Sequence, residues 1–231
     1  MLPLSDHNPR STTPVINYLL IAVNVWVFLW ELSFGANLER ALYVMAFIPA
    51  RFWYAPFDPA NWLTILLSMF LHGGWLHIGG NMLYLWIFGD NVEDRLGHFK
   101  YLVFYLLCGF IATMTHAVVN APSTVPSIGA SGAIAGVLGA YLVLFPKQRV
   151  TTLIPIFFFI MIREIPAVFL LGFWFVLQLF VGVASIGPQQ QGAGVAYFAH
   201  IGGFIAGMIL IVVMGGLRPR RRRVYADELW R

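Results

Sequence analysis

The sequence predicts an all-α integral membrane protein, folded as a compact bundle of six transmembrane helices with both termini in the cytoplasm. Hydrophobic residues make up 59% of the 231 residues and charged residues only 10%. That is too little charge to cover the surface of a soluble domain of this size. The apolar residues gather in runs of about 20, the length that crosses a hydrocarbon core of about 30 Å. We therefore expect a multi-pass protein whose surroundings are a lipid bilayer.

Six apolar runs are expected to form a membrane domain over residues 15–216. A cytoplasmic segment of residues 1–14 precedes this domain, and a basic cytoplasmic tail of residues 217–231 follows it. We expect the spans at 15–34, 76–88, 99–119, 131–145, 165–183 and 195–216, with an apolar approach over 62–71 before the second span.

Residues 150–162 are also apolar, but they are too few to cross a bilayer. The run has about 13 residues and contains Pro155, which interrupts a helix. We therefore expect an interfacial connection between the fourth and fifth spans.

The placement of basic residues predicts the orientation, because cytoplasmic loops retain lysine and arginine near the ends of spans. Loop 35–61 is an exception, since it is expected outside but carries Arg40 and Arg51 beside Glu39 and Asp58. The basic residues that place both termini in the cytoplasm are Arg10, Arg95, Lys100, Lys147, Arg149, Arg218, Arg220, Arg221, Arg222 and Arg223.

The arginine-rich tail is expected to contact anionic lipid rather than nucleic acid, because it directly follows a span. The single cysteine, Cys108, cannot form an internal disulfide. The residues before Val15 are polar and contain proline, and the first apolar run is long enough to remain as a span, so we expect no cleavable signal peptide. This pattern favours a bacterial cytoplasmic membrane as the host.

Four polar residues lie near the expected outer ends of three spans that run from outside to inside. His77 and Asn81 are in the second span, Ser131 begins the fourth, and His200 lies near the start of the sixth. Their depths should therefore be similar. A polar residue at such depth is costly and tends to face the bundle interior, which makes each of them a candidate functional residue.

Ser131 lies in Ser-Ile-Gly-Ala-Ser-Gly, residues 127–132, where a loop with two prolines turns into a helix. Glycines on both sides let the backbone approach a substrate, and the free N–H groups of a helix start can donate to an oxyanion. Taken alone, the string is more often small-residue packing between membrane helices. The serine needs a base before it can be interpreted as a nucleophile.

His200 can supply that base. A stripe of Gly203 and Gly207 in the sixth span faces, by our expectation, a matching stripe of Gly132, Gly136 and Gly139 in the fourth. Such small faces let two helices approach closely, which would bring the Ser131 hydroxyl to the imidazole. A histidine that is merely hydrogen-bonded inside the bundle is the alternative.

His77 and Asn81 are four residues apart, so they share one face of a helix. Both can donate hydrogen bonds to a tetrahedral oxyanion. A metal site built from His72, His77, His116 and His200 is a weaker alternative, because the chain has no His-Glu-x-x-His and no cysteine pair. We expect neither a metal nor a cofactor.

A Ser-His dyad is expected rather than a Ser-His-Asp triad. Only Glu39 and Asp58 lie clearly outside by the span count, with Glu31 near the outer end of the first span. None of the three is placed to orient His200.

With these residues, the sequence closely resembles the rhomboid family of intramembrane serine proteases, from about residue 17 to residue 216. Any one of the shared motifs is weak, but four in the right order and at matching depth are specific. They are His-Gly-Gly-Trp-Leu-His-Ile-Gly-Gly-Asn at 72–81, Glu-Asp-Arg-Leu-Gly at 93–97, Gly-Ala-Ser-Gly at 129–132 and Ala-His-Ile-Gly-Gly-Phe-Ile-Ala-Gly at 199–207.

The resemblance implies a rhomboid-like six-helix bundle that cleaves membrane-spanning protein substrates. By this resemblance, Ser131 attacks the scissile carbonyl, and His200 acts first as base and then as acid. His77, Asn81 and the Ser131 N–H, joined by the N–H of Ala130, look like the oxyanion hole. The loop at 184–194 is expected to be a movable cap.

The chain departs from the best-known members at two places. Ala135 occupies a position where some members carry a tyrosine that stacks on the histidine, so another group must orient His200. In the first outer loop the frequent Trp-Arg pair appears as Trp62-Leu63.

The alternative function is a catalytically inactive rhomboid-like protein that binds membrane clients, a role that demands neither Ser131 nor His200. The sequence predicts neither the natural substrate nor the oligomeric state.

Overall fold

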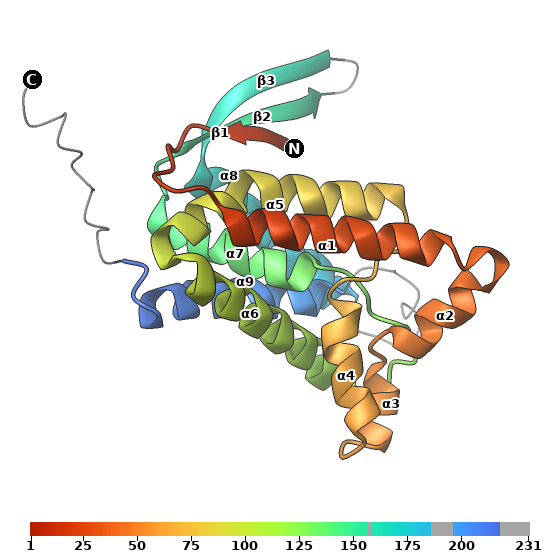
Figure 1. Ribbon diagram of the computed structural model, residues 1–231. Coiled ribbons are helices and arrows are strands. Elements are labelled where there is room, and N and C mark those ends of the chain that lie inside the picture. Colours follow the sequence, from red (N-terminus) through yellow and green to blue (C-terminus); the bar gives the residue numbers. More distant parts are fainter. Residues whose placement is uncertain (157–158, 186–195, 218–231) are drawn as a thin grey trace, which may run out of the picture.

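The computed structural model describes residues 1–156, 159–185 and 196–217, and it shows a helical bundle beside a small sheet (Figure 1). The chain forms in order β1 (Leu2–Asp6), α1 (Val15–Leu32), η1 (Gly35–Asn37), α2 (Leu38–Met45), α3 (Pro49–Tyr54), α4 (Pro59–Ser68), α5 (Trp75–Leu96), α6 (His98–Val119), α7 (Ser131–Leu144), β2 (Arg149–Ile156), β3 (Phe159–Pro166), α8 (Ala167–Ala184) and α9 (Tyr197–Val213).

Each predicted span overlaps a helix, although α5 continues to Leu96, beyond the expected end at 88. Three helices of the described chain, α1, α6 and α8, are long and apolar enough to cross a membrane. Helix α5 has 22 residues but ends in a charged stretch, whereas α7 and α9 are apolar and have 14 and 17 residues. At 1.5 Å per residue α7 extends about 21 Å, less than the hydrocarbon thickness of about 30 Å. The short length of α7 therefore allows a residue at its start to lie below a membrane surface.

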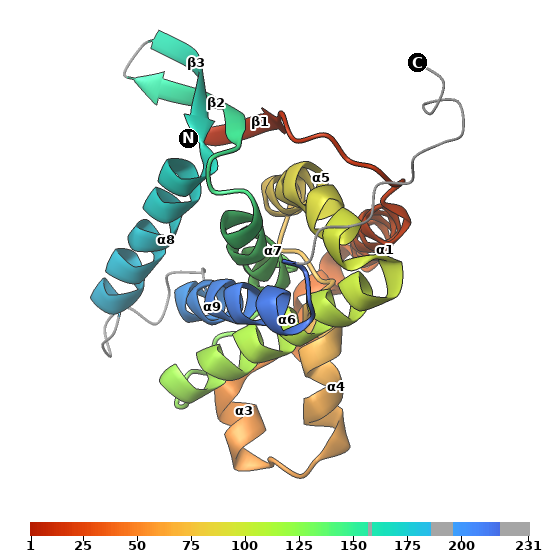
Figure 2. The ribbon, with the colours of Figure 1, turned by 90° about the vertical axis from the view of Figure 1, so that its left-hand side faces the viewer.

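Helix α7 lies in the middle of the bundle, with α5, α6, α8 and α9 around it (Figure 2). All residues from Gly132 to Tyr141 are buried. Gly203 and Gly207 of α9 lie against the carbonyl oxygens of Gly132 and Gly136. This is the close packing of small faces that the sequence predicts for these two helices, and it leaves no room for a side chain between them.

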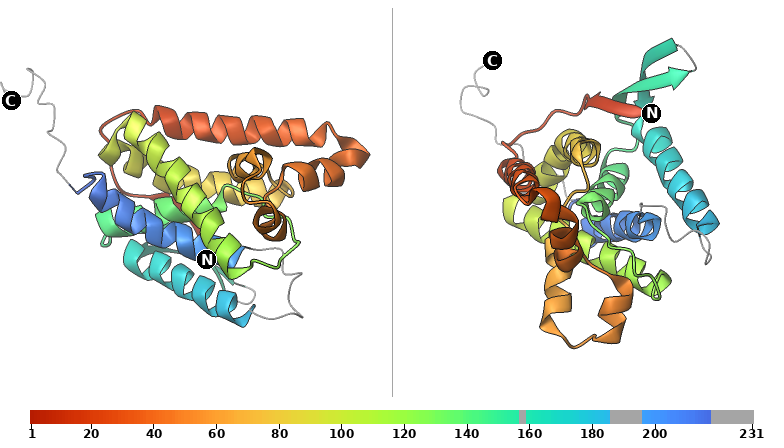
Figure 3. Two further views of the ribbon diagram at one scale, coloured as in Figure 1. Left: turned by 90° about the horizontal axis from the view of Figure 1, so that it is seen from below. Right: turned by 90° about the vertical axis from the view of Figure 1, so that its right-hand side faces the viewer.

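The chain between α1 and α5 folds into short helices that project from the side of the bundle (Figures 2 and 3). The apolar approach expected at 62–71 is mainly α4, a helix separate from α5. Phe47 and Ser127 exchange both backbone hydrogen bonds, and the N–H of Gly129 donates to the carbonyl of Ser68 at 2.8 Å. The projecting region therefore supports the loop that leads into α7.

A three-stranded antiparallel sheet in the order β1-β2-β3 corrects the prediction of an all-α fold. Strands β2 and β3 form a hairpin from residues 149–166, where an interfacial connection was expected at 150–162. The hairpin is rich in β-branched residues, which favour strands. Strand β1 reaches only to Leu153 of β2, so Pro155 lies where β2 has one neighbour and the missing N–H is tolerated.

The sheet also includes part of the segment expected before the membrane domain. Strand β1 lies within residues 1–14 and pairs with β2. Strand β1 lies against α5, and β3 continues directly into α8, which begins at Ala167 rather than at 165 because Pro166 ends the strand.

Two buried glutamates of the bundle accept hydrogen bonds from backbone N–H groups. Glu93 accepts from the N–H groups of Ile16 and Asn17 at 3.0 and 2.7 Å, so it satisfies the free donors at the start of α1. Glu31 of α1 accepts from the N–H of His72 with both carboxyl oxygens at 3.2 Å. Glu31 thereby fixes the loop that precedes α5.

Candidate active site

Ser131 is the first residue of α7, at the end of a loop whose conformation requires glycine. Gly129 has a φ of +125°, which residues with a side chain rarely adopt. A β-carbon on Gly129 would stand 2.8 Å from the Nε2 atom of His77 and 3.6 Å from the Ser131 hydroxyl oxygen. The glycine therefore keeps open the space between the serine and α5.

His200 comes to Ser131 from α9. The Nε2 atom of His200 lies 2.8 Å from the Ser131 hydroxyl oxygen, although the two residues are 69 positions apart. Gly203, one turn further along α9, contacts the first turn of α7 and allows the helices to approach this closely. A hydroxyl in hydrogen-bond contact with an imidazole is the arrangement that activates a serine for attack.

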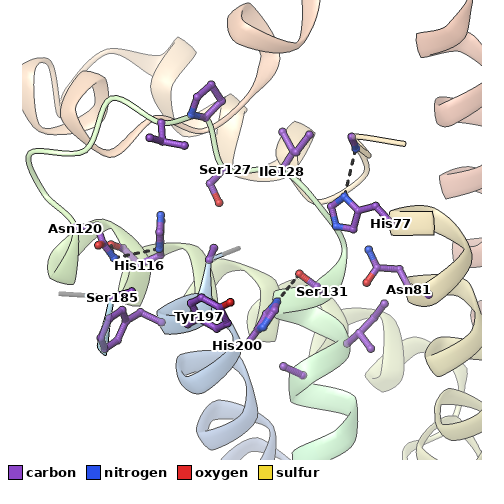
Figure 4. Close-up of a pocket in the computed structure, with 18 of the residues that line it drawn as sticks. His77, Asn81, His116, Asn120, Ser127, Ile128, Ser131, Ser185, Tyr197 and His200 are labelled. Carbon is purple, nitrogen blue, oxygen red and sulfur yellow. Dashed lines mark hydrogen bonds between the residues drawn. The ribbon is translucent and has the colours of Figure 1, made fainter. Parts of the chain in front are cut away.

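His77 and Asn81 point from α5 toward the same space (Figure 4). The Nδ1 atom of His77 accepts from the N–H of Gly73 at 3.3 Å, so in the neutral ring the proton is on Nε2. The buried side-chain nitrogen of Asn81 has no hydrogen-bond partner among the described residues. Both side chains therefore have an N–H available for an oxygen of a bound substrate.

The backbone at Ala130 and Ser131 adds further donors. The first hydrogen bond of α7 runs from the N–H of Ile134 to the carbonyl of Ala130, so the N–H of Ser131 lies outside the helical pattern. The carbonyl of Ser127, four residues before Ser131, accepts from Phe47 instead. Ala130 is fully buried, and its N–H precedes the helix at the same place.

His77, Asn81, Ser131 and His200 line one cavity of about 980 Å³. Its wall is formed by the start of α5, the loop 122–128, the first turns of α7, the middle of α8 and the start of α9. His116 and Asn120 line it at the far side from α5, and the Nδ2 atom of Asn120 lies 3.2 Å from the Nδ1 atom of His116 (Figure 4). The cavity is large enough for an extended stretch of peptide at Ser131.

Two residues of α8 that the sequence analysis did not select contact His200. The side-chain oxygen of Gln178 lies 2.8 Å from the Nδ1 atom of His200, and Gln178 is buried. The ring of Trp174, one turn earlier, lies 5.8 Å from the imidazole centre at an angle of 34°. A glutamine inside an apolar span was the available signal, because polar residues at membrane depth are generally functional.

The other histidines have separate partners. His72 packs its ring against His77, with centres 5.1 Å apart. Within the described residues no three of histidine, cysteine, aspartate and glutamate gather as a metal-binding cluster. Glu31, which the sequence analysis found unsuited to orient His200, contacts the His72 backbone instead. Most of the loop 184–194, expected to be a movable cap, lies outside the described residues.

Comparison with known proteins identifies the family of this chain. Residues 59–217 match the family model described as the Rhomboid domain. Rhomboid protein 1, mitochondrial, of Saccharomyces cerevisiae is 27% identical over 220 residues, which cover 92% of this chain and 58% of the yeast protein. Rhomboid-like protein 11, chloroplastic, of Arabidopsis thaliana is 27% identical over 202 residues, 84% of this chain and 63% of the plant protein.

A bacterial protein also matches. Rhomboid protease GluP of Bacillus subtilis is 34% identical over 137 residues, which cover 59% of this chain and 26% of GluP. The chain thus spans less than two thirds of the length of each of these three relatives. Two of these relatives are named for organelles and one comes from a bacterium, so the comparisons support an integral membrane protein but not the bacterial cytoplasmic membrane expected from the sequence.

Proposed function

Because this chain belongs to the rhomboid family, we propose that it is an intramembrane serine endopeptidase that cleaves membrane-spanning protein substrates at Ser131. The observation that carries the proposal is the 2.8 Å contact between the Ser131 hydroxyl and His200. In the same cavity, the amide nitrogen of Asn81 has no hydrogen-bond partner within the part of the chain that the structure describes. The name of the Bacillus subtilis relative, a rhomboid protease, supports the same activity.

The proposed reaction proceeds through an acyl-enzyme. The Ser131 oxygen bonds to the scissile carbonyl carbon while its proton passes to the Nε2 atom of His200. The resulting oxyanion accepts hydrogen bonds from His77, Asn81 and the backbone N–H groups of Ser131 and Ala130. His200 then gives its proton to the leaving amine as the C–N bond breaks. A water molecule, deprotonated by His200, releases the second product and restores Ser131.

The proposed topology has six spans, α1, α5, α6, α7, α8 and α9, with both termini in the cytoplasm. The start of α1 and the end of α9 lie at the same end of the bundle (Figure 1). Lys100 at this end donates to the carbonyl of Met214, and Arg10 pairs with Asp90 at 3.1 Å. The clustering of basic groups at one end supports a cytoplasmic location for it.

The test of the activity uses the purified full chain in detergent with a single-span substrate that has a small residue at the cleavage point. Wild type should release two fragments, and Ser131→Ala and His200→Ala should release none. Ser33→Ala and His7→Ala, at exposed positions outside the cavity, are matched controls that should cleave normally. Equal cleavage by wild type and Ser131→Ala would refute the proposal.

A client-binding protein without catalysis predicts a different outcome. Such a protein would capture the same substrate intact, and Ser131→Ala would change nothing. A serine-directed phosphonate separates the two functions without a substrate, because it should label Ser131 in wild type and label His200→Ala much more slowly.

A further inference from the structure

The hydrogen bond between Gln178 and His200 determines which imidazole nitrogen holds the proton. The Nδ1 atom of His200 faces the side-chain oxygen of Gln178 at 2.8 Å. An amide oxygen only accepts, so Nδ1 must be the protonated nitrogen. In the neutral ring the opposite nitrogen, Nε2, then has a free lone pair, and this atom faces the Ser131 hydroxyl at 2.8 Å. This is the tautomer that a general base needs.

From this geometry we infer that Gln178 is a positioning residue, the third member of a Ser131-His200-Gln178 arrangement. The inference rests on the proposed function. Gln178 does for His200 what a carboxylate does in a serine-protease triad, but without a charge. When Ser131 transfers its proton, His200 becomes a cation with two N–H groups, and the Gln178 oxygen accepts the bond from Nδ1 while positive charge develops on the ring.

Trp174 supports the same ring from its side. Trp174 and Gln178 lie four residues apart, so both point from one face of α8. The Trp174 ring contacts His200 and also Phe204, one turn further along α9, at 5.9 Å. The imidazole is therefore held at its edge by Gln178 and flanked by an indole, which fills the role left open by Ala135.

The position of α8 explains why a neutral amide serves here. Helix α8 lies at the edge of the bundle (Figure 2). It exposes much of its apolar surface, whereas Gln178 is one of its few buried residues. A carboxylate at this depth would add the cost of burying a charge, which an amide avoids. Because α7 and α9 are packed by glycine contacts, α8 is the element whose position decides whether His200 keeps its acceptor.

The experiment compares Gln178→Leu and Gln178→Glu with wild type in the cleavage assay. Gln178→Leu should lower kcat about 10- to 100-fold, the range for loss of one hydrogen bond to a charged group, with KM little changed. Gln178→Glu keeps an acceptor oxygen and should restore most of kcat. Its pH–rate profile should have an acidic limb at higher pH, because a carboxylate favours the protonated imidazole. Gln148→Leu, an amide loss outside the cavity, is the matched control.

The outcomes separate this inference from the proposed function. If wild type cleaves and Gln178→Leu retains its kcat, the positioning role is wrong while the protease remains. If Gln178→Glu is as slow as Gln178→Leu, the loss comes from packing and the positioning role is again wrong. If wild type itself does not cleave and is not labelled by a phosphonate, the proposed function fails and the inference fails with it.

Discussion

Gly203 of α9 lies directly against the carbonyl oxygen of Gly132 in α7. This contact is one turn below the point where Ser131 meets His200, so it sets the distance between the two helices at the candidate active site. A β-carbon on Gly203 would overlap the Gly132 carbonyl oxygen. The backbone fixes the positions of both atoms, so no side-chain rotation can relieve the overlap. The spacing of the site thus depends on the absence of one methyl group.

Gly203→Ala should therefore separate the serine from the histidine. We expect a loss of stability of about 1–3 kcal/mol, as for other overpacked interiors, and a larger loss of kcat than of substrate affinity. Gly172→Ala on α8 is the matched control, since a β-carbon there would meet no atom within 4 Å. Thermal unfolding and cleavage rates measured on both variants check this. Wild-type kcat in Gly203→Ala would show that the helix contact does not set the site.

The donors on α5 give a second prediction. Asn81→Ala and His77→Ala should each lower kcat by about 100- to 1,000-fold, the usual effect of losing one oxyanion donor, and should leave KM nearly unchanged. Labelling of Ser131 by a phosphonate should slow in parallel, because the bound phosphoryl oxygen occupies the same place. Asn120→Ala, at the far side of the cavity, is the comparison variant and should affect KM rather than kcat. An Asn81→Ala enzyme with undiminished kcat would remove Asn81 from the oxyanion hole.

Helix positions could be predicted from the sequence because a helix satisfies its backbone within one segment. The helix at 99–119 could be predicted from the length of its apolar run alone, and the structure has α6 at His98–Val119. The meeting of Ser131 and His200 could also be predicted, since the matching glycines at 132, 136, 203 and 207 indicate a pair of helices that pack closely.

The sheet could not be found with the same criterion. Residues 150–162 were interpreted by the length that a helix needs, whereas Val150 pairs with Ile165 in the hairpin and with Asp6 of β1, 144 positions earlier. Such pairing leaves no local trace beyond β-branched residues. The role of Gln178 was missed for a related reason. One glutamine within an apolar span indicates that its side chain has a hydrogen-bond partner, but the sequence does not identify that partner.

Glu31 gives a third prediction, which tests how the loop before α5 is held. It is fully buried, and its carboxyl group accepts from the N–H of His72, while the next N–H, of Gly73, donates to His77. Glu31→Leu leaves the His72 N–H without an acceptor, at a cost of about 1–3 kcal/mol, and should lower kcat through His77. Glu39→Leu, on the exposed helix α2, is the control. The measurements are the unfolding temperature and kcat, and unchanged values of both would contradict this role.

The last prediction concerns pH and the attachment of β1. Asp6 accepts hydrogen bonds from Tyr141 at 2.7 Å and from Asn91 at 2.9 Å. Burial raises the pKa of Asp6 from 3.8 to about 6, and the neighbouring Asp90 adds to the rise against the Tyr141 bond. Between these two pH values the Asp6 carboxyl keeps its proton in the folded protein and loses it in the unfolded chain. This contribution to stability is therefore complete below about pH 4 and is lost as the pH rises through 6.

The variant Asp6→Asn should flatten the pH dependence of stability, whereas Glu164→Gln, which changes an exposed carboxyl on β3, should leave it in place. The measurements are the unfolding temperature from pH 4 to pH 8 and the hydrogen exchange of the β1 amides at pH 4 and at pH 8. An identical pH dependence in wild type and Asp6→Asn would show that Asp6 does not couple the sheet to the bundle.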